Sequence, residues 1–200
     1  RRWPVGINRL KLPRCTCYSR RNSPVLQPRK IMVNGRNFQT KKRLNMTISL
    51  LSIGTSMPSW VNQGFLEYAK RLNPPWNLNL IEVPAKKRTK TASMTAILNQ
   101  ESEQLWQMKP KGALNITLDR NGKSHNSQQL AQLLNNSLAL GQHTNFFIGG
   151  PEGLSAQINS LANHNISLSP LTFPHPLVRV ILAEQLYRAW SIVHNRPYHR

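Results

Sequence analysis

A glycine-rich segment is the clearest place in this sequence where backbone atoms could bind a ligand. Residues 149–153 read Gly-Gly-Pro-Glu-Gly and lie between an apolar run and a helical pattern. Three glycines in five positions let a ligand approach the backbone closely, and the start of the next helix favours negative charge. A tight turn that needs glycine for a positive φ also explains these residues. The spacing is not Gly-x-Gly-x-x-Gly, so a dinucleotide-binding fingerprint is not supported.

A second candidate binding segment is the proline-rich loop 169–176, Ser-Pro-Leu-Thr-Phe-Pro-His-Pro. Prolines restrict the backbone, and a rigid loop can present N–H and C=O groups to an adenine edge at little ordering cost. Considered alone, His175 is better explained as an ordinary residue at a helix start, with Pro176 at the first helical position. Both candidate segments follow predicted strands, and open α/β sheets bind ligands at the carboxyl ends of their strands.

Two further segments carry groups that suit contact with RNA. Lys86, Lys87, Arg88 and Lys90 form a basic loop that could hold phosphates without reading the base sequence. The alternative is a loop that is merely solvated. The C-terminal tail, residues 194–200, is dense in hydrogen-bond donors and aromatic rings, as an RNA contact would be. For the tail, the alternative is a frayed terminus.

The sequence lacks the motifs of the common hydrolases and nucleotide-binding enzymes. It contains no His-Glu-x-x-His, Gly-x-Ser-x-Gly or Walker A motif, and no paired carboxylates suited to acid–base catalysis. Its seven acidic residues are too scattered to suggest a metal site, so no metal is expected. Any reaction therefore depends on positioning, on an activated small-molecule donor and on a few polar groups.

Alternating apolar runs and helical patterns must position these loops. Short apolar, β-branched runs predict strands, and apolar residues at helical spacing predict the helices between them. The alternation predicts an α/β fold with a mostly parallel sheet covered by helices on both faces. The last helix carries few charges, so it should be buried in the core or in a subunit interface, with Glu184 and Arg188 paired along one side. Strands are predicted at 47–53, 78–83, 113–118, 144–148 and 166–168, with a turn at 119–122, and helices at 60–72, 92–108, 128–140, 154–162 and 177–192.

Positive charge is concentrated near the N-terminus. The chain has 27 Lys and Arg against 7 Asp and Glu, and this balance of +20 points to a polyanion such as nucleic acid. Residues 1–45 hold 13 of the basic residues and no acid (+13), whereas residues 46–200 supply +7 (14 − 7). Residues 1–45 show no periodicity, and we interpret them as a basic N-terminal extension outside the fold. A disordered RNA-binding arm, an organellar transit peptide and sequence upstream of a natural start at Met46 remain the alternatives.

Cysteine content and hydropathy give no indication of an oxidising compartment or of a membrane location. Cys15 and Cys17 are too close for a useful disulfide and have no nearby Cys or His partners, so they are a weak metal signal. No stretch approaches the roughly 18 apolar residues that span a membrane. We therefore expect a cytoplasmic protein with no membrane partner.

Several longer stretches resemble one known family. They are 48–72, 81–88 (IEVPAKKR), 116–123 (ITLDRNGK), 149–153 (GGPEG), 168–190 (LSPLTFPHPLVRVILAEQLYRAW) and 195–200 (NRPYHR). In this order they are similar to the RlmH family of the SPOUT superfamily, bacterial enzymes that methylate N3 of a pseudouridine in 23S ribosomal RNA. The resemblance covers essentially all of 46–200 and none of 1–45.

The resemblance implies properties that the patterns alone do not give. It implies a C-terminal trefoil knot, although knots are rare among folds, and a homodimer acting on 23S ribosomal RNA. The modest +7 of residues 46–200 favours RNA within the assembled ribosome. The resemblance also implies S-adenosylmethionine as the methyl donor. We expect catalytic groups in the tail, and phosphate contacts in the basic loop because of its charge. The implied donor-binding residues are Leu118, Gly149, Gly150, Pro170, Leu171, Thr172, Phe173, Pro174 and His175; the catalytic candidates are Tyr198, His199 and Arg200; the substrate-binding candidates are Lys86, Lys87, Arg88 and Arg196.

The sequence is also compatible with other functions. A different SPOUT-type methyltransferase would share the donor but modify another nucleotide or another RNA. A ribosome-binding factor that keeps the fold without turnover belongs to a different class, and it would bind the donor without transferring a methyl group. An NAD-type oxidoreductase is disfavoured by the missing fingerprint.

Overall fold

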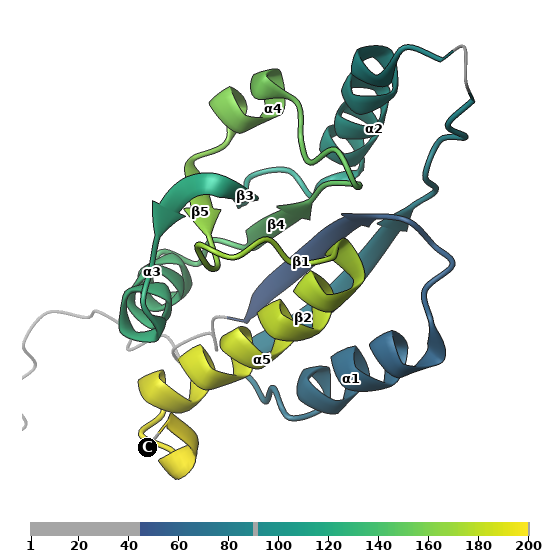
Figure 1. Ribbon diagram of the computed structural model, residues 1–200. Helices are drawn as coiled ribbons and strands as arrows, with labels where there is room; N and C mark the ends of the chain where they lie inside the picture. The colour runs from purple at the N-terminus through teal and green to yellow at the C-terminus, as the bar shows by residue number, and fades with distance from the viewer. Residues whose placement is uncertain (1–44, 90–91, 200) are drawn as a thin grey trace, which may run out of the picture. The chain divides into compact units, whose positions relative to one another are not determined.

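The computed structural model describes residues 45–89 and 92–199, and within them it contains a five-stranded, entirely parallel sheet (Figure 1). The strand order is β2-β1-β4-β3-β5, so the two halves of the chain meet where β1 pairs with β4. The strands are β1 (Met46–Ile53), β2 (Trp76–Val83), β3 (Leu114–Ser124), β4 (Thr144–Ile148) and β5 (His164–Ser167); the helices are α1 (Ser59–Ala69), α2 (Met94–Met108), α3 (Ser127–Ala139), α4 (Ala156–Leu161), α5 (His175–Val193) and the 3₁₀ helix η1 (Pro197–His199).

Helices cover both faces of the sheet. On one face, α1, α3 and α5 pack onto a core that includes Leu50 and Phe146. On the other face, α2 packs onto a smaller core that includes Leu51 and Phe147. Neighbouring residues of β1 and β4 thus point to opposite cores, which is why these strands are buried along almost their whole length. The predicted α/β fold with a parallel sheet covered on both faces is confirmed.

The end of the third strand differs from the prediction. The Asp-Arg-Asn-Gly sequence at 119–122 predicts a turn that ends the strand, but β3 continues to Ser124. The ladder with β5 is interrupted between Leu118 and Lys123, and pairing resumes at Lys123 and Ser124. A local turn signal therefore produces an irregularity within the strand, because pairing with β5 extends β3 beyond it.

The last helix is buried largely by its own chain. It packs against both α1 and α3, and its side chains Leu182, Ala183 and Leu186 are fully buried. The predicted pairing of Arg188 with Glu184 is confirmed, with a nitrogen–oxygen distance of 2.6 Å. The predicted trefoil knot stays a prediction of the family resemblance.

Parts of three sequence-based predictions lie outside the described residues: the basic extension, the basic loop and, through Arg200, the C-terminal tail. The basic extension, with Cys15 and Cys17, lies there except for its last residue, and so does Lys90 of the basic loop. Within residues 45–89 and 92–199, no helix is both long and apolar enough to cross a membrane.

Candidate functional site

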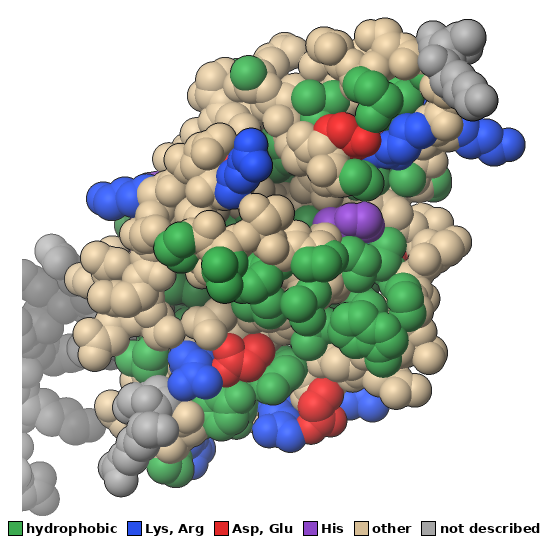
Figure 2. Space-filling model, viewed as in Figure 1, with side chains coloured by type: hydrophobic (Ala, Val, Ile, Leu, Met, Phe, Trp, Pro, Cys, Tyr) green, Lys and Arg blue, Asp and Glu red, His purple; other side chains and the backbone are tan. Residues whose placement is uncertain are grey.

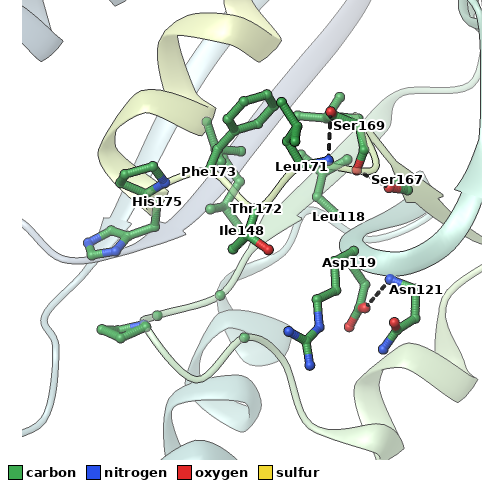
Figure 3. A pocket seen from close by; sticks show the side chains of 18 of the residues that line it. Leu118, Asp119, Asn121, Ile148, Ser167, Ser169, Leu171, Thr172, Phe173 and His175 are labelled. Atoms are coloured by element: carbon green, nitrogen blue, oxygen red, sulfur yellow. Dashed lines mark hydrogen bonds between the residues drawn. The ribbon is translucent and has the colours of Figure 1, made fainter.

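A cavity of about 810 Å³ lies at the carboxyl ends of β3, β4 and β5 (Figure 3). This is the edge at which open parallel sheets bind ligands. The glycine-rich loop and the proline-rich loop, which follow β4 and β5, both contribute to its wall. Of the nine predicted donor-binding residues, Pro170 alone is not part of the lining. The eight that line the cavity are Leu118, Gly149, Gly150, Leu171, Thr172, Phe173, Pro174 and His175.

The glycine-rich loop folds back on itself at this cavity. Gly150 and Gly153 pair across the loop, and the Gly153 N–H donates to the Gly150 carbonyl at 3.0 Å. A Cβ placed on Gly149 would lie 2.1 Å from the Gly153 carbonyl oxygen. Glycine is therefore required at 149 because the backbone crosses itself there, and Gly153 adopts a positive φ of 85°. The tight turn is therefore confirmed, and the same segment lines the cavity, while its contact with a ligand stays a prediction.

Both serine hydroxyls and prolines determine the shape of the proline-rich loop. Ser167 Oγ donates to the Ser169 carbonyl and the Leu171 N–H donates to Ser169 Oγ, each at 2.9 Å (Figure 3). These bonds turn the chain directly after β5 and leave Leu171 70% exposed. Sequence analysis missed this contribution, although serine beside proline is a common turn signal.

The stretch after Leu118 also lines the cavity, through Asp119, Arg120 and Asn121. Asp119 accepts hydrogen bonds from the Asn121 N–H at 2.8 Å and from Asn159 Nδ2 at 3.1 Å. Sequence analysis interpreted these residues only as a turn, although their position after a strand at the ligand-binding edge was an available signal. The cavity thus has a polar side formed by β3 in addition to its two loops.

His175 lies at the start of α5, at the opposite end of the cavity from Asn121 (Figure 3). Burial is the largest influence on its pKa and lowers it from 6.5; the positive charges of Arg179 and Arg88 lower it further, against the opposing effect of Glu101 and Glu152. The imidazole is therefore neutral at pH 7. The site thus presents a neutral ring where histidine could otherwise carry charge.

A buried arginine that sequence analysis missed anchors the start of α5. Arg179 is 1% exposed and forms an ion pair with Glu82 of β2. Its guanidinium also donates to Ser52 Oγ at 2.9 Å and to the carbonyls of Ile53 and Gly54 at the end of β1. The helix that carries His175 is therefore tied to the carboxyl ends of two strands.

In the basic loop after β2, Arg88 forms ion pairs within the protein and Lys87 is exposed to solvent. The guanidinium of Arg88 binds the carboxylates of Glu101 and Glu152, whereas the side chain of Lys87 is exposed. Lys86 is half-buried and its N–H donates to Glu101 at 2.8 Å. The loop therefore combines exposed positive charge with an internal ion pair at the wall of the cavity.

The tail folds back along the C-terminal half of α5. Tyr198 donates to Glu184 Oε1 at 3.2 Å and packs edge-on against Tyr187. Burial, hydrogen bonding with Tyr68 and the nearby Glu184 raise the pKa of Tyr198 to about 12, so its phenol is protonated at neutral pH. Arg196 is exposed, the backbone of His199 closes η1, and Arg200 lies outside the described residues.

The tail and the cavity lie at opposite ends of the same helix. His175 begins α5 and lines the cavity, whereas the tail follows its nineteenth residue. At 1.5 Å per residue, the end of α5 lies about 28 Å from His175, and Glu184, which Tyr198 contacts, lies about 14 Å from it. A single chain therefore does not bring Tyr198 into contact with the predicted donor-binding residues. Among the residues that the structure describes, no group of three or more His, Cys, Asp or Glu is placed to hold a metal ion.

These features define a class of protein: a parallel α/β protein with a cavity built by loops at the carboxyl edge of its sheet, where such folds bind ligands. Comparison with known proteins makes the assignment specific. The family model described as predicted SPOUT methyltransferase matches residues 46–199. The chain therefore belongs to the SPOUT methyltransferase family.

Two relatives that match in sequence agree with this assignment. The chain is 46% identical over 155 residues to "Ribosomal RNA large subunit methyltransferase H" of Legionella pneumophila (strain Paris), covering 78% of this chain and 99% of that protein. The protein of the same name from Thioalkalivibrio sulfidiphilus (strain HL-EbGR7) matches with the same identity and coverage. A solved structure of a probable methyltransferase from Bordetella pertussis Tohama I has a TM-score of 0.49 at 14% identity, over 73% of this chain and 96% of that one.

Proposed function

We propose that this protein transfers a methyl group from S-adenosylmethionine to N3 of a pseudouridine in 23S ribosomal RNA, within the ribosome and in the cytoplasm. The observation that carries the proposal is the cavity formed jointly by the glycine-rich and proline-rich loops. Eight of the nine residues expected to bind the donor line it. The name and near-complete coverage of the 46% identical relatives support the ribosomal substrate.

The chain's own residues would hold and orient the donor. Gly149 and Gly150 leave room for the donor beside the backbone, and the proline-rich loop offers backbone groups to its adenine without large ordering. The donor supplies an electrophilic methyl group on a sulfonium. As the N3–C bond forms and the C–S bond breaks, sulfur keeps the electron pair of the C–S bond and the N3 proton passes to the solvent. The products are the N3-methylated nucleotide, S-adenosylhomocysteine and a proton. Alignment of the two reactants is the main contribution of such a site.

We further propose a homodimer in which the tail of one protomer completes the site of the other. Within one chain, α5 keeps Tyr198 and Arg196 away from the cavity. Hydrophobic side chains gather over α5 and α1 on the face shown in Figure 2, and Trp60 of α1 is 52% exposed. Exposed apolar surface of this kind is typical of a protein interface. Tyr198, His199 and Arg200 are then the candidates to contact the reacting nucleotide, with the Tyr198 phenol as a hydrogen-bond donor.

Mixed dimers test this composite site. A variant shortened to end at Pro197 and a Gly149→Ala variant are each expected to be inactive in methyl transfer. After they are mixed and allowed to exchange subunits, methyl transfer should return, because each mixed dimer contains one intact cavity and one intact tail that meet at the same site. The control is each variant carried alone through the same exchange. No recovery in mixtures shown by native mass spectrometry to contain mixed dimers would contradict the arrangement.

The neutral state of His175 gives a pH dependence for donor binding. Because the pKa of His175 is lowered from 6.5, most of the rings gain a proton only below pH 6.5. The cationic ring would then repel the sulfonium of the donor. We expect the dissociation constant of S-adenosylmethionine, measured by calorimetry, to be constant from about pH 8 to pH 6.5 and to rise below it. A His175→Asn variant should lack that rise, and a rise shared by the variant would assign the effect to another group.

Two segments, the basic loop and the tail, complete the proposed RNA contact. Lys86, Lys87 and Arg196 are the proposed phosphate ligands, and residues 46–200 carry a balance of only +7 (14 − 7). Since this charge is modest for the capture of free RNA, the assembled ribosome is the proposed substrate. Residues 1–45 are proposed to be dispensable for the reaction.

The decisive experiment is nucleoside mass spectrometry of 23S RNA after reaction. Ribosomes that lack the modification are incubated with S-adenosylmethionine and either the full chain or residues 46–200. N3-methylpseudouridine formed by both proteins would establish the reaction and show that residues 1–45 are dispensable. Donor binding without methyl transfer to any ribosomal RNA would instead favour a binding factor, and methylation elsewhere would indicate another RNA target.

A further inference from the structure

Every nitrogen of the Arg88 guanidinium donates hydrogen bonds within the protein. Its two terminal nitrogens bind the two carboxylate oxygens of Glu101, each at 3.0 Å, and Nη1 also donates to the Lys86 carbonyl at 2.8 Å. Nε and Nη2 bind the two carboxylate oxygens of Glu152 at 3.2 and 2.6 Å. Each guanidinium nitrogen therefore has a partner in the chain, which leaves Arg88 poorly placed to serve as a simple phosphate ligand.

The side chains of Arg88, Glu101 and Glu152 come from three separate parts of the chain and join them. Arg88 belongs to the loop after β2, Glu101 lies in α2, and Glu152 lies in the glycine-rich loop. Glu101 is 2% exposed, so its carboxylate requires a partner, and Arg88 supplies a bidentate one. Glu152 is 26% exposed in its side chain and lines the cavity. Arg88 thus connects a fixed buried anion to a residue of the cavity wall.

The glycine-rich loop rests directly on this cluster. A Cβ placed on Gly150 would lie 3.0 Å from Glu101 Oε2 and 3.1 Å from Arg88 Nη2. The Cα of Gly150, a residue expected to contact the donor, therefore faces both members of the ion pair with too little space between them for a side chain. The glycine-rich loop is thus held beside the ion pair at Gly150 and bound to it through Glu152.

We propose that Arg88 is a positioning residue for the methyl donor: it fixes the glycine-rich loop through Glu152 while anchored on buried Glu101. The inference rests on the proposed function, because it assigns the cavity to the donor. The inference assigns Arg88 to the donor site, whereas the charge of the basic loop predicts that Arg88 binds RNA. Lysine cannot replace this arginine, since one ammonium cannot make two bidentate contacts in a plane.

The test separates donor binding from ribosome binding. The variants are Glu152→Gln, which keeps the buried Arg88–Glu101 pair, and Arg88→Lys, which keeps the charge. The control is Lys111→Met, which removes an exposed positive charge before β3. For each full-length protein, calorimetry gives the dissociation constant of S-adenosylhomocysteine, and methyl transfer gives KM for donor and for ribosomes.

We expect both variants to weaken binding of S-adenosylhomocysteine by about tenfold, with the KM for ribosomes unchanged, and the control to match the wild type. In the double variant the two effects should not add, because both remove the same contact. If Arg88 were instead a phosphate ligand, Arg88→Lys and Glu152→Gln would leave donor binding intact, and Arg88→Lys would alter only the KM for ribosomes. That result would overturn the inference. A wild-type protein that binds neither S-adenosylhomocysteine nor S-adenosylmethionine would instead refute the proposed function.

Discussion

Replacement of Arg179 by methionine is expected to lower the free energy of unfolding by about 3–5 kcal/mol, as measured for broken buried ion pairs. Methionine fills similar space but removes the partner of Glu82 and the donor to Ser52 Oγ. It also leaves the carbonyls of Ile53 and Gly54 without the hydrogen bonds that Arg179 provides. Buried acceptors without donors each cost about 1–3 kcal/mol, so the loss exceeds that of one surface ion pair.

Denaturant unfolding followed by circular dichroism measures this effect. The matched control is Arg188→Met on the same helix, where a pair four residues apart with Glu184 is partly exposed. That pair should contribute only about 0.3–1 kcal/mol. Equal losses in the two variants would show that the buried network around Arg179 contributes no more than a surface pair.

Arg179 also illustrates what sequence patterns leave out. The helix was predicted from its apolar residues, and the pairing of Glu184 with Arg188 followed from their spacing of four. Ser52 and Glu82, the partners of Arg179, lie 127 and 97 residues away in sequence. No local pattern connects residues so far apart, so a charged residue within an apolar helix gives no sign that it is the buried anchor.

In the candidate site too, local residue patterns predict the loops, whereas contacts between residues far apart in sequence are not predicted. The loops at 149–153 and 169–176 were found because glycine, proline and their position after strands are local signals. The contact of Gly150 with Glu101 and Arg88 joins three elements, and it appears only once the sheet has placed β2 and β4 on either side of β1. For that reason Arg88 was predicted from its charge to bind phosphate, whereas its contacts lie within the protein.

The largest effect on activity is expected from Gly149→Ala. Gly149 does not have a positive φ, so alanine is excluded by space and not by backbone preference. Its Cβ would lie 2.1 Å from the Gly153 carbonyl oxygen and 2.2 Å from the carbonyl carbon, and both are backbone atoms. No side chain can rotate to relieve this contact, so the loop must open. Opening also breaks the pairing of Gly150 with Gly153, at the wall of the cavity.

We expect Gly149→Ala to reduce kcat/KM for methyl transfer by at least about 100-fold, because displacement of about 1 Å at a reacting site has an effect of that size. Donor binding should weaken in parallel, since the altered loop forms part of the proposed donor site. Gly112→Asn is the matched control: Gly112 has a φ of 71° that asparagine tolerates, and a Cβ there would meet no atom within 4 Å. Activity retained in Gly149→Ala, with a thermal transition like that of the control, would mean that the donor does not depend on the shape of this loop.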